Sequence, residues 1–340
     1  MFKINLIELK GVKTYPKNLA FLAALVFLLS MGLVGAFRSI QAQAEGMDSQ
    51  VQAKDKSREK ISLGESSGEL NNQGYLRTYK LYTPSSYNAN RPMPLVMVFH
   101  GHDGTGASIA DVTRFNDLAE QKGFIVVYPD GIEQNWNLRG ASSGKVDDVS
   151  FTTALIDRLQ QIRNIDSRRI YATGFSKGAI FAQDLACEIP DRIAAFASVA
   201  GALPVRLQPK CQPNTPISML MINGTKDLAV YYQGDVKTKR GALISVPETV
   251  NFWRSLDKCT SPAQVKQLPD PNPRDRFQVK SSHYSDCSGS SEVMLTDIVD
   301  GGHSWPGGAS QDPNQIQFNA AIGYSATDAI WEFFQRHSLR

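Results

Sequence analysis

The sequence predicts an α/β protein with a mainly parallel central sheet and helices on both faces. Continuous apolar runs, such as Leu95–Phe99 and Phe124–Tyr128, are typical of strands that are buried on both sides. Segments with apolar residues at helical spacing alternate with these runs along the chain. Because strands that alternate with helices pair in parallel through crossover connections, we expect a parallel sheet covered by helices.

The composition is that of a globular protein with a sizeable core. Of the 340 residues, 42% are hydrophobic, which excludes disorder of the whole chain. The formal net charge is +3, and residues 1–44 contribute +4 from five basic residues against Glu8, so the rest carries 3 − 4 = −1. The sequence therefore lacks the basic surface of a nucleic-acid-binding protein. We also expect no metal and no organic cofactor.

The first 44 residues have the features of an export signal. Four lysines precede an apolar run from Leu19 to Phe37, and Ala42 and Ala44 are small residues where a signal peptidase reads them. We expect cleavage after Ala44 and a secreted or periplasmic protein. The alternative is an uncleaved N-terminal anchor, because the run is nearly long enough to span a bilayer. The expected division of the chain is a leader at 1–44, a polar linker at 45–62 and one folded domain at 63–340.

The first half of the domain shows helix caps and a glycine-rich loop. Ser108 can cap a helix with Asp111 at the capping-box position, and apolar residues recur at helical spacing up to Gly123. The loop at residues 100–106 would lie at the carboxyl edge of the sheet, where open α/β sheets bind ligands. We expect an edge strand at 75–82, a strand at 95–99, a helix at 108–123, a strand at 124–128, a loop at 129–145 and a helix at 147–165.

The second half continues the alternation. Ser245 and Glu248 form a capping box with Pro247 in the first turn, and Ser325 with Asp328 caps the last helix. We expect a strand at 169–173, a helix at 177–188, strands at 194–199 and 217–222, a helix from 245, strands at 279–285 and 293–299, and a helix from 325.

The candidate chemistry is organised around Gly174-Phe175-Ser176-Lys177-Gly178. A Gly-x-Ser-x-Gly turn between a strand and a helix is a nucleophile elbow, whose glycines leave room for a sharp bend that lifts the serine hydroxyl clear of the sheet. The pentapeptide also arises in ordinary glycine- and serine-rich turns, so the flanking strand and helix carry the prediction. We expect Ser176 to be a nucleophile.

A serine nucleophile needs a histidine base within hydrogen-bond reach. In enzymes with such an elbow, the order along the chain is serine, acid, histidine. Three histidines follow Ser176: His303 lies in a glycine-rich loop after a strand, whereas His283 lies within a strand and His337 at the end of the last helix. We expect His303 to be the base.

The expected acid is Asp227, which would fix the tautomer of the histidine. It follows the strand at 217–222 and would lie at the same edge of the sheet. Glycine, threonine and aspartate are also common in ordinary turns. Asp235 is the alternative.

The tetrahedral oxyanion of such a reaction needs two backbone donors. The amide of Lys177, at the start of the helix, is the first that we expect. The second would come from the loop after the first buried strand, where we choose His102, with Asp103 as the alternative.

The exported part contains four cysteines, and an even count there favours two disulfides. Three pairings are possible, and the sequence-adjacent one, Cys187 with Cys211 and Cys259 with Cys287, encloses the shortest loops. We expect that pairing. Metal binding is the alternative, but no Cys-x-x-Cys or Cys/His spacing supports it.

Several motifs between residues 75 and 337 combine into a family resemblance. They are His100-Gly101, Tyr128-Pro129-Asp130-Gly131 with Trp136-Asn137, the elbow, Asn223-Gly224-Thr225-Lys226-Asp227, and Gly302-His303-Ser304-Trp305-Pro306-Gly307. Together they resemble the secreted esterases grouped as poly(3-hydroxybutyrate) depolymerases and feruloyl or acetylxylan esterases. The resemblance implies an α/β-hydrolase fold, a triad of Ser176, Asp227 and His303, and the adjacent cysteine pairing.

The sequence departs from this family pattern in the presumed pocket. Asn223 stands where the family often has histidine, and His102-Asp103 replaces small residues or cysteine, so we expect a polar pocket. Trp136 and Trp305 flank the presumed site. They could stack on an aromatic acyl group or a sugar, or fill the core under the loops.

The sequence therefore predicts a secreted serine carboxylesterase. No residues remain for a polymer-binding module, which favours small or oligomeric esters, of plant polysaccharides or hydroxyalkanoates, over crystalline polyester. The alternatives are a peptidase of the same fold, although those usually carry a gating domain, and a non-catalytic extracellular binding protein. We expect no nucleic-acid partner, and a membrane only if the leader stays uncleaved.

Overall fold

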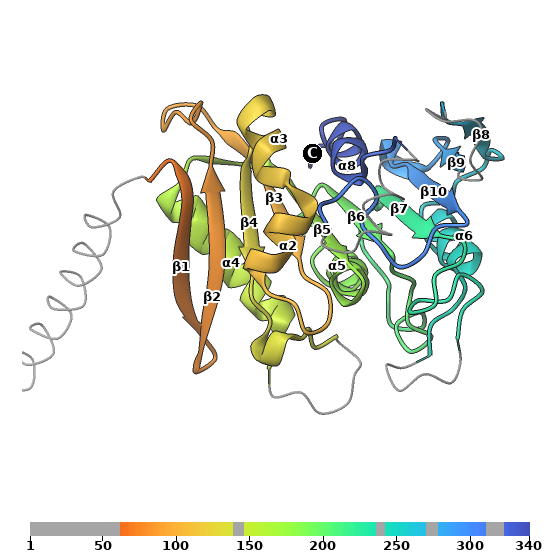
Figure 1. Cartoon of the computed structure of the whole chain (residues 1–340), viewed down its shortest axis with the longest axis horizontal. Helices are drawn as coiled ribbons and strands as arrows, with labels where there is room; N and C mark the ends of the chain where they lie inside the picture. Colours follow the sequence, from red (N-terminus) through yellow and green to blue (C-terminus); the bar gives the residue numbers. More distant parts are fainter. Residues whose placement is uncertain (1–61, 139–145, 236–241, 270–277, 311–322) are drawn as a thin grey trace, which may run out of the picture. The chain divides into compact units, whose positions relative to one another are not determined.

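The computed structural model of the chain describes residues 62–138, 146–235, 242–269, 278–310 and 323–340 (Figure 1). These residues belong to one compact unit, Ile61–Arg340. The predicted leader, and all but the last residue of the predicted linker, lie outside the described residues. Across the described ranges, no helix is both long enough and apolar enough to cross a membrane.

Ten strands of the described residues form one sheet, in the order β1-β2-β4-β3-β5-β6-β7-β10-β9-β8 (Figure 1). Every pairing between β4 and β10 is parallel, and the pairings outside them are antiparallel. The prediction of a mainly parallel sheet is therefore confirmed. The strands are β1 (Gly64–Asn72), β2 (Tyr75–Thr83), β3 (Met93–Phe99), β4 (Ile125–Pro129), β5 (Ile165–Phe175), β6 (Ala195–Val199), β7 (Met219–Gly224), β8 (Gln264–Gln267), β9 (Gln278–Tyr284) and β10 (Val293–Val299).

Helices cover both faces of the sheet, as predicted. Along β3, Leu95 and Met97 belong to one hydrophobic cluster, and Val96 and Val98 belong to the other. The first cluster contains residues of α4, α5 and α6, and the second contains residues of α2, α3 and α8. The helices are α2 (Gly106–Thr113), α3 (Phe115–Lys122), α4 (Asp148–Ile162), α5 (Lys177–Glu188), α6 (Val246–Leu256) and α8 (Ala326–Phe334), with short 3₁₀ turns η1 (Ile132–Gln134) and η2 (Ser288–Ser290).

The two outermost strands differ from the sequence prediction. The strand predicted at 75–82 as an edge, observed as β2, is covered on its outer side by β1, which pairs with it from Gly64 to Asn72. β1 is rich in glycine and polar residues, and β8 at the opposite edge is fully exposed. Neither strand has alternating apolar residues, so each exists as a strand because its backbone pairs with a neighbour. For this reason the sequence pattern did not predict them.

The helix predicted at 108–123 is two helices in the structure. Arg114, between α2 and α3, adopts a left-handed conformation with a φ of 54°, which breaks the helical path. The helix also begins earlier than expected: Thr105 is the N-cap and Ser108 occupies the third helical position. The prediction at Ser245 is confirmed, because its side chain and that of Glu248 form a capping box at the start of α6.

Two disulfides join the cysteines in the sequence-adjacent pairing. Cys187, near the end of α5, is bonded to Cys211, in the segment between β6 and β7. Cys259, after α6, is bonded to Cys287, between β9 and β10. Each disulfide therefore joins a helix-end region to a segment that lies elsewhere in the chain, and no cysteine is free.

Candidate active site

Ser176 lies at a sharp bend between β5 and α5. Its φ of 55° and ψ of −115° are rare for a residue with a side chain, and such conformations cost about 1–3 kcal/mol. The amide of Ser176 donates to the carbonyl of Val199, at 2.9 Å, and so attaches the bend to the end of β6. The local geometry is that of an elbow, as the sequence predicts.

The two glycines of the elbow motif permit close backbone contacts. A Cβ on Gly174 would lie 2.5 Å from the carbonyl carbon of Gly178. A Cβ on Gly178 would lie 2.2 Å from the carbonyl oxygen of Phe99, at the end of β3. Both distances are too short for any side chain, so these positions require glycine.

His303 and Asp227 are hydrogen-bonded to each other. Nδ1 of His303 lies 2.7 Å from Oδ2 of Asp227. The carboxylate is buried, and its Oδ1 accepts from the amides of Ala229 at 2.7 Å and Val230 at 2.8 Å. Because a carboxylate surrounded by donors accepts hydrogen bonds, Nδ1 carries the imidazole proton and Nε2 is left as an acceptor.

Backbone bonds between two loops bring this pair together. β7 and β10 are parallel neighbours, and the turn after β7 is bonded to the loop after β10: the amide of Thr225 donates to Ile298 at 3.0 Å, and that of Lys226 to Gly301 at 2.9 Å. Nζ of Lys226 also lies 2.7 Å from Oδ1 of Asp300. These contacts explain how residues 76 positions apart meet at one edge of the sheet.

The histidine lies beside the elbow. Its imidazole packs against the ring of Phe175, the residue before Ser176, with the ring centroids 4.8 Å apart. Asp227, rather than the alternative Asp235, is the carboxylate bonded to His303. The structure therefore brings the three predicted residues to the carboxyl edge of β5, β7 and β10.

A cavity of about 400 Å³ adjoins Ser176. Its wall is mainly apolar, with three polar residues besides Ser176, so the expectation of a polar pocket holds only in part. The polar residues are His102, Asn135 and Lys177, and the apolar ones are Leu138, Ile180, Pro204, Ala229, Val230 and Leu243.

The loop after β3 supplies His102 to this cavity. Of the two residues considered for an oxyanion amide, Asp103 donates its backbone N–H to the carbonyl of Gln134 at 3.0 Å. Because that amide is already bonded, His102 is the favoured donor. The loop also lies close to the nucleophile, since a Cβ added to Gly101, the neighbour of His102, would be 3.5 Å from Cβ of Ser176.

His100 organises the same loop as a buried neutral imidazole. Its Nδ1 donates to the carbonyl of Gly101 at 2.7 Å, and its Nε2 accepts from the amide of Gly131 at 2.9 Å. Burial lowers the pKa of His100 below its ordinary value, and nearby carboxylates only partly oppose this. His100 is thus a structural residue.

Trp136 and Trp305 lie in the core and do not line the cavity. Trp136 stacks on Phe181 with ring centroids 5.0 Å apart, and its indole N–H donates to the carbonyl of His100 at 2.8 Å. The indole of Trp305 is also buried and donates to Oγ1 of Thr327. Of the two alternatives considered for these tryptophans, the structure shows the second, in which both rings fill the core under the loops.

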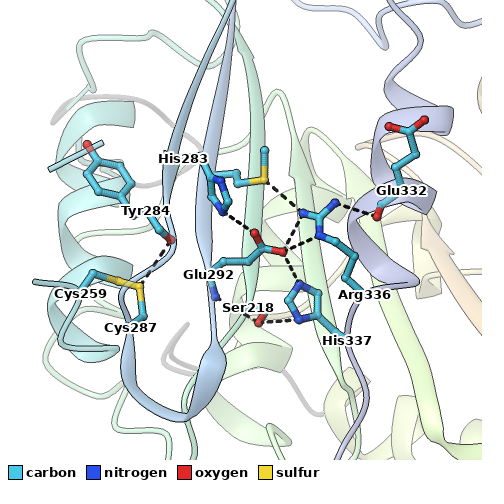
Figure 2. A network of polar contacts seen from close by, with 10 residues as sticks. Ser218, Cys259, His283, Tyr284, Cys287, Glu292, Glu332, Arg336 and His337 are labelled. Atoms are coloured by element: carbon cyan, nitrogen blue, oxygen red, sulfur yellow. Dashed lines mark hydrogen bonds and ion pairs between the residues drawn. A yellow bond between two sulfur atoms is a disulfide. The ribbon is translucent and has the colours of Figure 1, made fainter. Parts of the chain in front are cut away.

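The two other histidines after Ser176 meet at Glu292 instead (Figure 2). Nε2 of His337 lies 2.8 Å from Oε1 of Glu292, and Nε2 of His283 is paired with Oε2. Arg336 also donates to this carboxylate, at 2.7 Å. Glu292 precedes β10 and His303 follows it, so the cluster and the candidate site lie at opposite ends of that strand.

Across the described residues, no group of three or more histidine, cysteine, aspartate or glutamate side chains is arranged to hold a metal ion.

The sequence and the fold match known proteins. Residues 77–205 match the family model described as Esterase PHB depolymerase. "Putative esterase NocK" of Nocardia uniformis subsp. tsuyamanensis is 30% identical over 253 residues, 69% of this chain and 72% of that protein. "Feruloyl esterase B" of Piromyces equi is 29% identical over 231 residues, 65% of this chain but 41% of that protein.

A solved structure shares the fold. The acetyl xylan esterase from Aspergillus awamori aligns with 79% of this chain and 99% of its own, with a TM-score of 0.55 and 16% sequence identity. At that identity the likeness concerns the arrangement of strands and helices, which is that of an α/β-hydrolase.

Proposed function

Since this chain belongs to the Esterase PHB depolymerase family, and is therefore a serine hydrolase of carboxylic esters, we propose that Ser176, His303 and Asp227 form its catalytic triad. The hydrogen bond between Asp227 and His303, located beside the elbow, is the observation that carries the proposal. It leaves Nε2 of the imidazole as the acceptor that a serine hydroxyl needs.

In the proposed reaction, Oγ of Ser176 attacks the ester carbonyl. Nε2 of His303 takes the hydroxyl proton and returns it to the departing alcohol, and Asp227 stabilises the imidazolium that forms in between. Water then attacks the acyl-enzyme with the same histidine as base, which releases the acid and restores the serine.

The proposed oxyanion donors are the amides of Lys177 and His102. Lys177 is the first residue of α5, so its N–H belongs to the positive end of the helix dipole. Both residues line the cavity next to Ser176. Each such donor typically lowers the barrier by about 3 kcal/mol.

The proposed substrates are small or oligomeric carboxylic esters, with feruloyl or acetyl esters of plant polysaccharides and hydroxyalkanoate oligomers as the candidates. The names of relatives support the polysaccharide esters, and the description of the matching family model supports the hydroxyalkanoates. The two disulfides support export, because disulfides persist in oxidising compartments.

The decisive experiment is the Ser176→Ala variant, assayed on p-nitrophenyl acetate. We expect hydrolysis and labelling by a fluorophosphonate probe to be lost, with thermal stability retained. The matched control is Ser255→Ala, which removes an exposed hydroxyl from α6 and should change neither readout. Unchanged turnover in Ser176→Ala would overturn the triad.

Peptide substrates, tested beside the ester, and the fluorophosphonate probe separate the rival functions. A peptidase of this fold would cleave peptide substrates in preference to esters, and a non-catalytic binding protein would not be labelled at Ser176. A screen of feruloyl esters, acetylated xylan and hydroxybutyrate oligomers then identifies the substrate class.

A further inference from the structure

Three exposed apolar side chains lie next in the chain to residues that line the cavity beside Ser176. Val205, Leu228 and Tyr231 are 40%, 79% and 44% exposed. Their respective chain neighbours Pro204, Ala229 and Val230 line the cavity. We call these three exposed residues the rim. Leu228 is the most exposed large apolar residue of the described chain.

The backbone holds Leu228 in a fixed position. Oδ1 of Asp227 accepts from the amides of Ala229 and Val230, which closes a tight turn around Leu228. Within that turn Val230 is 4% exposed and belongs to the core, whereas Leu228 faces solvent. A side chain on such a turn loses little backbone freedom when a ligand covers it.

The second side of the rim is also attached to the cavity wall. The amide of Val205 donates to the carbonyl of Ala242 at 3.0 Å, and Pro204 forms a β-bridge with Leu243. Pro204 and Leu243 both line the cavity. The backbone that carries Val205 is therefore bonded to the apolar wall.

A single exposed leucine needs no explanation by itself. Leu63, Leu76 and Val265 are also exposed, and they lie at or next to β1, β2 and β8, the outer strands of the sheet. The rim differs from them because each of its residues is the chain neighbour of a residue that lines an apolar cavity beside the proposed nucleophile. Water at the rim is displaced only when a ligand extends out of that cavity.

We propose that the rim, and Leu228 above all, binds the apolar part of an ester that extends beyond the cavity. The proposal rests on the proposed function and specifies its substrate class: esters with an apolar chain or ring longer than the cavity encloses. Short esters use the cavity alone. Leu228 is in this sense a specificity residue, since it acts on the remote part of the substrate.

The test compares Leu228→Ser with wild type on two ester series. The first varies the acyl chain, p-nitrophenyl acetate to octanoate, and the second varies the alcohol, methyl to octyl acetate, all below their micelle concentrations. We expect Leu228→Ser to lower kcat/KM for the long member of at least one series by about tenfold, equal to about 1.4 kcal/mol, and to change the short members less than about twofold.

Two further variants make the result specific. Leu76→Ser removes a leucine that is 60% exposed on β2 and should leave both series unchanged. Leu228→Met restores an apolar side chain of similar volume and should restore the long-chain activity.

The outcomes are distinguishable. If wild type hydrolyses none of the esters, the proposed function fails. If wild type is active and Leu228→Ser changes long and short members of both series alike, or changes none of them, the rim does not bind substrate and the inference is overturned.

Discussion

Gly224, the last residue of β7, packs so closely against Gly301 that a Cβ on Gly224 would lie 2.4 Å from the carbonyl oxygen of Gly301. The same atom would lie 2.4 Å from the carbonyl oxygen of Gly302. This contact joins the turn that carries Asp227 to the loop that carries His303. The distance between Asp227 and His303 therefore depends on Gly224 having no side chain.

Gly224→Ala should separate the two loops and lengthen the hydrogen bond between Asp227 and His303. Since a misplacement of about 1 Å can cost about a hundredfold in rate, we expect kcat on p-nitrophenyl acetate to fall by about that factor. Gly302→Ala is the matched control, because a Cβ there meets nothing within 4 Å. Equal activity of the two variants would contradict this account.

Asp227→Asn should keep the fold and lose the activity. The amide oxygen can still accept from Ala229 and Val230, but the amide N–H₂ would face Nδ1 of His303 and move the imidazole proton to Nε2. We expect kcat to fall by about 10⁴-fold, with a midpoint of thermal unfolding close to that of wild type. Asp227→Ala should lose stability as well, since both amides of the turn then lack their acceptor. A fully active Asp227→Asn enzyme would exclude Asp227 as the orienting acid.

His100 should make stability depend on pH below about 6.5. Burial lowers the pKa of His100 in the folded protein, so the unfolded chain binds its proton first as the pH falls. Stability is therefore full above the ordinary histidine pKa and is lost on acidification, by at most about 1.4 kcal/mol per pH unit. Thermal unfolding of wild type and His100→Gln between pH 7 and pH 5 measures this. We expect the shallower slope in the variant, and parallel curves would refute a neutral buried His100.

Glu292 should stabilise the fold down to acidic pH. Burial alone would raise its pKa, but hydrogen bonds from His337 and Arg336 lower the pKa to about 2 (Figure 2). The contribution is complete above the ordinary glutamate pKa of 4.5 and is lost as the pH falls towards 2. We expect Glu292→Gln to lower the free energy of unfolding at pH 7 by about 2 kcal/mol, because the hydrogen bonds to the buried carboxylate lose their charge assistance while Arg336 stays partly solvated.

Urea unfolding at pH 7 and at pH 3 checks this prediction. Glu332→Gln is the control, because its exposed side chain lies outside the cluster and only its carbonyl accepts from Arg336. Esterase activity at 25 °C should be unchanged in both variants, since the cluster and His303 are at opposite ends of β10. A stable Glu292→Gln protein would mean that the cluster adds little to folding.

The central part of the fold was predictable because its signals are local. Short apolar runs such as Leu95–Phe99 are typical of strands covered on both faces, and β3 and β4 are fully buried as expected. Polar β1 and the left-handed Arg114 depend on neighbours that are distant in the sequence or on a single backbone angle. Neither β1 nor the break at Arg114 leaves a periodic pattern in the sequence from which it could be predicted.

The candidate site was predictable to the extent that motifs fix backbone shape. The elbow glycines and the position of Asp227 after a strand sufficed to locate three converging loops. The burial of Trp136 could not be predicted from the sequence, because it depends on packing against Phe181 and on a hydrogen bond to the carbonyl of His100. The apolar residues Ala229 and Val230, which follow Asp227 in the sequence, are a signal for the cavity wall that they form.

The two disulfides bear on how this enzyme has to be produced. Their cysteines are 24 and 28 residues apart in the sequence, and closing loops of that size stabilises a protein by about 3 kcal/mol each. An expression host that folds the chain in a reducing cytosol would deliver it without either cross-link. A negative substrate screen on such material would reflect the host and not the enzyme, so production belongs in an oxidising compartment.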